Sequence, residues 1–308
     1  KLMLREGDLA RAAGMAEALG RGQVGKPDQK KLLPLASAAV ESMATAGVFA
    51  PLWAALKGDD PIRREQSRTV LAALGEGALQ FLVNIVIREE DAEVRKMAAS
   101  LLRSLPGAGL RLLVPQLHPP TSGEVAARIV SVLDLVAPEP GTEFFFLLAH
   151  PDVLVRAEFA GVVSRLPKAT AVAFLERALE ERDPGILAGG LECIRGVQGQ
   201  ELVDAIVRLL RREAPPEVLK AACLCLGQLK DERAVGPLVE ILQHRARFLG
   251  LVKGSPETVR AAAARALGEL GDREAQDALR AVLKDGSMTV RSTARLALAR
   301  LKQARGAR

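Results

Sequence analysis

Aromatic side chains are almost absent from this sequence: among 308 residues there is no Tyr, one Trp and 8 Phe. Proteins that hold single-stranded nucleic acid by stacking need several exposed rings, and this composition supplies few of them. Long apolar runs are absent as well, because no stretch reaches the roughly 18 residues that a membrane-spanning helix needs. We therefore expect neither a membrane span nor an extended base-stacking surface.

Cysteine is also sparse, and the three residues, Cys193, Cys223 and Cys225, fall within predicted helices among apolar neighbours. An odd number of small buried thiols is typical of a reducing compartment, so we expect a cytoplasmic protein. The alternative is a metal site at Cys223 and Cys225. Residues two apart on a helix point to different faces, and no further His or Cys lies nearby in sequence, so we predict no metal and no cofactor.

The positive charge gathers at one end of the chain. The formal net charge is +6, yet residues 243–308 hold 14 Lys and Arg against 6 Asp and Glu, which leaves the preceding residues slightly acidic as a group. A local field of one sign attracts partners of the other sign. The sequence therefore predicts that an acidic partner binds near the C-terminal end.

A two-helix unit appears twice in clear form between residues 254 and 301. Each copy places apolar residues at positions i, i+4, i+8 and i+11, which share one face of a helix. The two sets are Val259, Ala263, Leu267, Leu270 and, 31 residues later, Val290, Ala294, Leu298, Leu301. A fixed period of this length predicts a repeat architecture with one continuous core.

The same stripe returns along most of the chain, at intervals of 30 to 32 residues with one interval of 41. The first residues of the successive stripes are Ile62, Val94, Val125, Val155, Ile186, Val218, Val259 and Val290. The start of the first stripe is ambiguous between Ile62 and Arg63, because a stripe that begins at Arg63 would contain Leu71 and Leu74. Asp or Ser near a Pro precedes several second helices and is a helix-start signal.

This arrangement predicts an all-α solenoid. We expect a repeat array over residues 48–301, an atypical helical cap or the tail of a preceding domain over residues 1–47, and a basic tail over residues 302–308. Within the cap, Asp8 is expected to begin a helix through Leu19, and a second helix is expected from Gln29 to Ala46.

The repeats resemble the HEAT family, in particular the short version known as PBS-lyase HEAT-like repeats. The resemblance rests on the Asp-Pro turns, the Val-Arg pairs that open several second helices, and the ending Ala266-Leu267-Gly268-Glu269-Leu270. It implies about eight helix pairs in a right-handed superhelix whose second helices line the concave face. It also implies that the Arg of a Val-Arg pair commonly pairs with the turn Asp of its own or of the neighbouring unit, as Asp60, Asp91 and Asp152 would allow.

Catalytic chemistry finds little support in the residues. His118, His150 and His244 lie in different repeats and form no His-Glu pair, which disfavours the metal-dependent hydroxylases built on similar repeats. No nucleophile lies next to a base. A bilin lyase remains a weaker alternative on resemblance alone, and we expect a protein without enzymatic activity.

The 41-residue interval marks an insertion from His244 to Gly254 that is both basic and apolar. Insertions in repeat arrays project as loops, so this segment is the first candidate for partner binding. The residues expected to contact the partner are Arg245, Arg247, Phe248, Leu249, Leu251 and Lys253. The structural alternative is that its apolar residues fold back and cover a helix end.

The predicted function is therefore a non-enzymatic scaffold for protein–protein interaction, with a partner that has an acidic surface. The rival is sequence-independent binding of nucleic acid by the basic C-terminal repeats, through contacts to the phosphate backbone. The candidate basic contacts on the concave face are Arg260, Arg265, Arg291 and Arg295.

Overall fold

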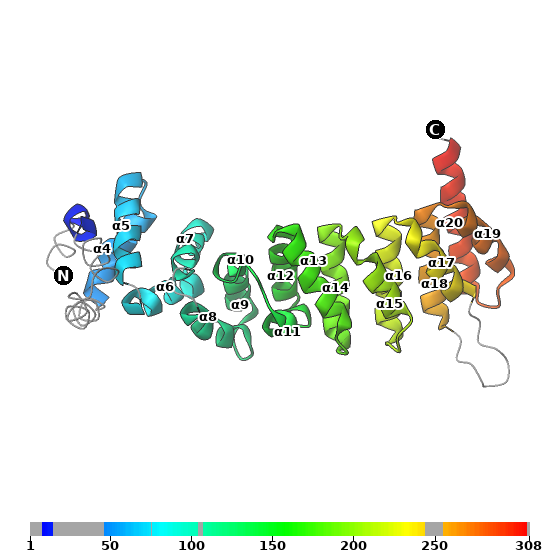
Figure 1. Cartoon of the computed structure of the whole chain (residues 1–308), viewed down its shortest axis with the longest axis horizontal. Helices are drawn as coiled ribbons and strands as arrows, with labels where there is room; N and C mark the ends of the chain where they lie inside the picture. The colour runs from blue at the N-terminus through cyan, green and yellow to red at the C-terminus, as the bar shows by residue number, and fades with distance from the viewer. Residues whose placement is uncertain (1–7, 15–45, 75, 104–106, 244–254, 307–308) are drawn as a thin grey trace, which may run out of the picture. The chain divides into compact units, whose positions relative to one another are not determined.

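The computed structural model describes residues 8–14, 46–74, 76–103, 107–243 and 255–306, and their regular structure is helix alone (Figure 1). The chain divides into two compact units, Lys1–Pro138 and Glu139–Arg308. Eight consecutive helix pairs lie in the described ranges, three in the first unit and five in the second. The predicted all-α repeat fold is confirmed.

The first unit is built from three helix pairs in which first and second helices alternate along the chain. They are α4 (Ala46–Lys57) with α5 (Pro61–Leu74), α6 (Glu76–Arg88) with α7 (Ala92–Leu102), and α8 (Ala108–Leu113) and the 3-10 turn η2 (Val114–Leu117) with α9 (Gly123–Val130) and α10 (Leu133–Val136). Helix α6 packs against α5 of the first pair, against α7 of its own pair, and against α8 and α9 of the third, and so connects the three pairs.

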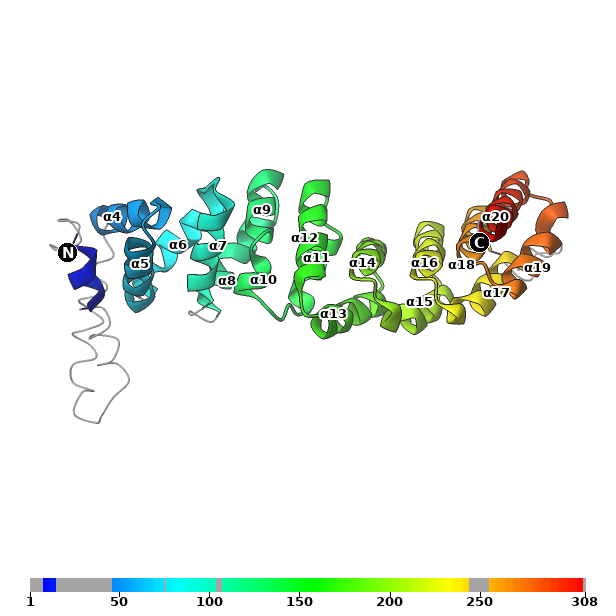
Figure 2. The ribbon, with the colours of Figure 1, turned by 90° about the horizontal axis from the view of Figure 1, so that it is seen from above.

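The second unit repeats the same plan five times, and several first helices open with a 3-10 turn. The first two pairs are η3 (Thr142–Phe144) and α11 (Phe145–Leu148) with α12 (Val153–Arg165), and α13 (Lys168–Glu180) with α14 (Pro184–Val197). The third and fourth are η4 (Gln200–Leu202) and α15 (Val203–Leu210) with α16 (Pro216–Leu229), and η5 (Glu232–Ala234) and α17 (Val235–Gln243) with α18 (Glu257–Leu270). In the last pair, α19 (Arg273–Ala281) and η6 (Val282–Lys284) precede α20 (Met288–Gly306). Within this unit the second helices stand side by side in one layer, and α13, α15, α17 and α19 form the other (Figure 2).

The turn aspartates begin the second helices, as the sequence predicts. A side-chain oxygen of Asp91, Asp152 or Asp183 accepts hydrogen bonds from backbone N–H groups of the following helical turn, which have no partner within the helix. Asp60 does the same for α5, with its Oδ1 2.9 Å from the N of Ile62. These caps fix where each second helix starts and therefore which face it turns toward the core.

The predicted apolar stripe is the core of the second helices. In α16, Val218, Ala222 and Leu226 are buried, and the corresponding residues of α12 and α18 are buried too. On α20 the stripe is buried at Val290 and Ala294 and only half-buried at its last two positions.

In the first repeat, the buried stripe is counted from Arg63 and not from Ile62. Ile62 is 68% exposed, whereas Ser67, Leu71 and Leu74, which lie 4, 8 and 11 residues after Arg63, are buried. The Ser67 hydroxyl donates to the Leu52 carbonyl at 2.9 Å, which satisfies the polar group in the core. Counting from Ile62 is therefore wrong by one residue.

Two glycines let second helices approach closely in the second unit. A Cβ at Gly227 of α16 would lie 2.7 Å from Cα of Ala266 on α18, and a Cβ at Gly268 of α18 would lie 2.6 Å from Cβ of Ala297 on α20. Only a residue without a side chain fits at such a contact. This explains the Gly in the repeated ending of the second helices.

Several predictions about the ends of the chain are not decided by the described residues. Residues 9–14 are helical, and the N of Arg11 donates to Asp8 Oδ1, while the second cap helix, Gln29 to Ala46, lies almost wholly outside the described residues. At the other end, α20 continues to Gly306 and includes most of the predicted tail. None of the described helices combines the length and the apolar character that crossing a membrane requires.

Candidate functional site

The predicted insertion site, His244 to Gly254, lies outside the described residues. Its six candidate contacts, Arg245, Arg247, Phe248, Leu249, Leu251 and Lys253, therefore stay predictions. The structure describes the helices that flank the insertion. Helix α17 ends at Gln243, and Nε of Arg260 on α18 donates to the Leu242 carbonyl at 3.0 Å. The helices on either side are thus bonded directly.

The arginines that follow the first stripe position hold the turn, but through backbone carbonyls rather than through the turn Asp. Nη1 of Arg156 donates to the carbonyls of His150 and Pro151, at 2.6 and 3.1 Å. Arg95 and Arg291 bond the equivalent two carbonyls. These carbonyls lie in the turn that follows the preceding helix, where no helical hydrogen bond satisfies them. The expected pairing is wrong for Asp60, Asp91 and Asp152, because those carboxylates cap helices instead. It is found where Arg260 pairs with Asp285, the turn Asp of the neighbouring repeat.

In the first repeat the same contact is made by Arg64, whose Nη2 donates to the Gly58 carbonyl at 2.8 Å. The sequence assigned this role to Arg63, which is exposed. The shift by one residue follows from the alignment that begins at Arg63.

Arg260 is the exception among these arginines because its side chain is buried. Its guanidinium forms an ion pair with Asp285 through two hydrogen bonds, and the side chains are 8% and 2% exposed. Asp285 also accepts from the N of Ser287 at 2.9 Å. A buried charge of this kind needs its partner, so Arg260 joins two repeats and is not open to a ligand.

The four predicted basic contacts therefore divide by what they touch. Arg260 is buried, Arg291 bonds carbonyls, and Arg265 pairs with Glu269 of its own helix at 3.2 Å. Arg295 is exposed, and no carboxylate of the described residues lies in ion-pair range of it. The structure does not gather these four side chains into one open row.

Arg295 belongs instead to an exposed face of α20 that also carries Leu296, Ala299, Arg300 and Lys302, here called the α20 face. At about 100° per residue, these five positions cover roughly 160° of the helix circumference. Leu296 is 64% exposed, and the three cations form no ion pair within the described ranges. In the two preceding repeats the position of Arg295 holds Cys223 and Ala264, both fully buried.

The cysteines have the character of core residues. All three are free and buried, and burial raises the pKa of each thiol to about 12. Cys225 Sγ lies 3.7 Å from the Leu191 carbonyl. His150 is buried as well, and its Nδ1 accepts from the N of Asp152 at 3.1 Å. Across the described residues, no three His, Cys, Asp or Glu side chains gather as they would around a metal ion.

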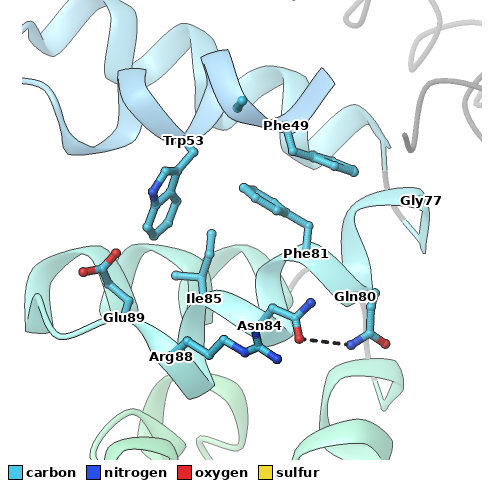
Figure 3. Close-up of a pocket in the computed structure, with 10 residues that line it drawn as sticks. Phe49, Trp53, Gly77, Gln80, Phe81, Asn84, Ile85, Arg88 and Glu89 are labelled. Atoms are coloured by element: carbon cyan, nitrogen blue, oxygen red, sulfur yellow. Dashed lines mark hydrogen bonds between the residues drawn. The ribbon is translucent and has the colours of Figure 1, made fainter. Parts of the chain in front are cut away.

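A groove between α4 and α6 in the first unit was missed at the sequence level. Phe49 and Trp53 of α4 reach toward Phe81 and Ile85 of α6, and these residues line a space of about 540 Å³ (Figure 3). The rings of Phe49 and Phe81 stack at 4.4 Å, and Trp53 meets Phe81 edge-on at 6.0 Å.

Polar side chains line the other side of this groove. Gln80 Nε2 donates to Asn84 Oδ1 at 3.3 Å, and Arg88 follows one helical turn later (Figure 3). Glu89 lies at the groove end, where Lys57 Nζ reaches it at 3.5 Å and also lies 5.6 Å from the Trp53 ring centre. The signal in the sequence is the placement of Phe49 and Trp53, and of Phe81 and Ile85, four residues apart in successive first helices.

Comparison with known proteins supports the repeat type. The model of the HEAT-repeat family matches residues 245–307, so the resemblance to HEAT repeats is confirmed there. Among curated proteins, deoxyhypusine hydroxylase of Gallus gallus is 32% identical over 116 residues. That match covers 35% of this chain and 33% of the relative, so the chain matches about a third of the relative's length.

Two solved structures are examples of those to which this chain is similar. Human deoxyhypusine hydroxylase in complex with glycerol gives a TM-score of 0.37 at 20% identity, over 88% of this chain and 99% of that chain. The structure of Kap121p bound to Nup53p gives a TM-score of 0.44 at 12% identity, over 96% of this chain and 37% of that chain. The assignment of the repeat fold rests on the helix pairs and on the matched residues.

Proposed function

We propose that the protein is a non-enzymatic scaffold for protein–protein interaction, and that its α20 face binds a partner with an acidic surface. The observation that carries the proposal is the combination on α20 of three exposed cations, which pair with no described carboxylate, with Leu296, a large apolar side chain that is 64% exposed. Interfaces join an apolar contact to complementary charges in this way. The free buried thiols agree with a cytoplasmic location.

The polar groups that recur in the repeats support a scaffold rather than an enzyme. The turn aspartates cap helices, and the arginines after them bond carbonyls, so both sets are engaged in holding the fold. The described thiols are buried with a raised pKa, which makes them poor nucleophiles. The relative of 32% identity is a hydroxylase, but the part of this chain that is described offers no cluster of metal ligands.

Nucleic acid is the second candidate partner, because the same three cations could bind phosphates. If Arg295, Arg300 and Lys302 were the contacts, about three phosphates would be neutralised, and the logarithm of affinity would fall against the logarithm of salt with a slope of roughly −3. Arg260, Arg265 and Arg291 are engaged elsewhere and would add little. A steep salt dependence with generic duplex DNA or RNA would favour this candidate.

The test compares proteins captured from nuclease-treated lysate by three forms of the full chain. They are the wild type, a triple variant of the α20 face with Arg295→Glu, Arg300→Glu and Lys302→Glu, and a control with Arg111→Glu, Arg195→Glu and Lys220→Glu. The control changes the net charge equally at exposed residues of other helices. We expect at least one protein to be retained by the wild type and the control and lost by the α20 variant. The capture is repeated from lysate without nuclease treatment. Equal retention by all three forms, or capture from the untreated lysate alone, would contradict the proposal.

A further inference from the structure

We propose that the groove between α4 and α6 binds an extended peptide segment in which a large aliphatic side chain is followed by a carboxylate. The groove of about 540 Å³ lies within the range of roughly 300 to 1,000 Å³ that is usual for ligand sites, and it combines an apolar floor with a few polar groups. This inference goes beyond the proposed function because it concerns another unit of the chain and another ligand, and it does not depend on the α20 face.

The floor favours an aliphatic side chain over a nucleobase. A base binds by stacking on an open ring face. Here one face of Phe81 is covered by the stacked ring of Phe49, and the Lys57 ammonium group lies over the Trp53 ring. The uncovered parts of these rings and the Ile85 side chain form the rest of the floor, and such apolar surface suits Leu, Ile or Val.

The charge at the groove favours a carboxylate. Glu89 is neutralised by Lys57 at 3.5 Å, and its carboxylate also accepts from the backbone N of Glu90 and Asp91. Arg88 is exposed at the end of α6 and forms no ion pair with any described residue. It is therefore the cation left open at this site, and a guanidinium binds a carboxylate through two parallel hydrogen bonds.

The two amides of α6 supply the third element. The bond from Gln80 to Asn84 uses one N–H of Gln80 and the carbonyl oxygen of Asn84. The Gln80 carbonyl then remains as an acceptor and the Asn84 amide as a donor. Both side chains are exposed and lie one helical turn apart, with Arg88 one turn further (Figure 3). An acceptor beside a donor matches the backbone of an extended chain that runs along α6 toward Arg88.

Trp53 allows a direct test because it is the one Trp of the whole sequence, which has no Tyr. Its fluorescence in the full chain is followed during titration with a short Gly- and Ser-based peptide, blocked at both ends, that carries one Leu followed by one Glu. Matched peptides replace the Leu by Ser or the Glu by Gln, and an oligothymidylate tests for nucleic acid. The protein variants are Arg88→Gln and, as a control at an exposed arginine of the same unit, Arg111→Gln.

We expect the Leu–Glu peptide to change the Trp53 emission in a saturable way below about 1 mM. Loss of the Leu should weaken binding by about tenfold or more, since the peptide then buries no large apolar side chain in the floor. Loss of the Glu, or Arg88→Gln, should each weaken it by up to about fivefold. Arg111→Gln should leave it unchanged.

Other outcomes overturn the proposal. No response to any peptide, with emission typical of a buried indole, would mean that other residues of the chain fill the groove. Equal binding of the peptides with and without Leu would remove the role of the floor. Saturable binding of the oligothymidylate that requires Arg88 would make the groove a nucleic-acid site. None of these results bears on capture through the α20 face, so the two proposals fail separately.

Discussion

The Gly227→Ala substitution tests the close approach of α16 and α18, which sets the spacing of the second helices in the second unit. The new Cβ would lie 2.7 Å from Cα and 2.9 Å from Cβ of Ala266. The first of these atoms belongs to the backbone, so the neighbour cannot rotate away, and α18 has to shift. Overpacking of this kind costs about 1–3 kcal/mol.

The same change also removes a glycine from a helix interior, which by itself stabilises by roughly 0.5–1 kcal/mol. The packing cost exceeds this gain, and we expect a net loss of about 1–2 kcal/mol. For a unit of this size, a loss of about 1 kcal/mol lowers the melting temperature by about 2–4 °C. The change in melting temperature is measured by thermal unfolding, followed by far-ultraviolet circular dichroism.

Gly161→Ala is the matched control, because Gly161 lies within the second helix α12 and its added Cβ would meet only Arg165 Nη1 at 3.5 Å. That atom ends a flexible side chain, so the helix propensity should decide and the variant should be more stable than the wild type. The reasoning is refuted if Gly227→Ala is as stabilising as Gly161→Ala, since α16 and α18 would then not be in contact at this point.

Four further predictions follow from the structure. Lys230 ends α16 with φ of 54°, so Lys230→Gly should stabilise by about 1 kcal/mol in chemical denaturation, and an unchanged midpoint would count against the left-handed cap. Asp285→Ala leaves Arg260 buried without its partner and should cost about 3–5 kcal/mol, whereas Arg260→Met combined with Asp285→Leu should recover much of that loss. Burial raises the pKa of the three thiols from an ordinary value of 9.0 to about 12, so stability should fall as the pH rises from about 9 toward 12, and a thiol reagent at neutral pH should react only with unfolded protein. If the insertion binds a partner, Phe248→Ala should mainly speed dissociation and charge reversal at Arg245 and Arg247 should mainly slow association, so unchanged kinetics in both variants would remove the insertion from the interface.

The period of the sequence was enough to predict the helix pairs, because a stripe such as Val218, Ala222 and Leu226 reports directly which face of a helix is buried. It left the first repeat ambiguous, since Ile62 and Arg63 give equally regular intervals. Burial of Ser67 decides between them, and a buried Ser is recognised only when its acceptor, the Leu52 carbonyl, is seen.

The roles of the arginines could not be read from spacing. A Val-Arg pair has the same appearance whether the guanidinium bonds carbonyls, as Arg156 does, or a buried carboxylate, as Arg260 does with a partner 25 residues away. The groove between α4 and α6 was missed for a similar reason. Phe49 and Phe81 are 32 positions apart, and only the packing of one repeat against the next brings the two rings to 4.4 Å.

The central claim, that the α20 face binds an acidic protein, is tested most directly by the affinity of a captured protein for the full chain at several salt concentrations. The claim predicts that the triple variant of the α20 face binds about tenfold more weakly or worse at low salt, a loss of about 1.4 kcal/mol, and that the difference shrinks as salt rises. The control with three reversed charges on other helices should match the wild type. Equal affinities for the α20 variant and the wild type at every salt concentration would contradict the account.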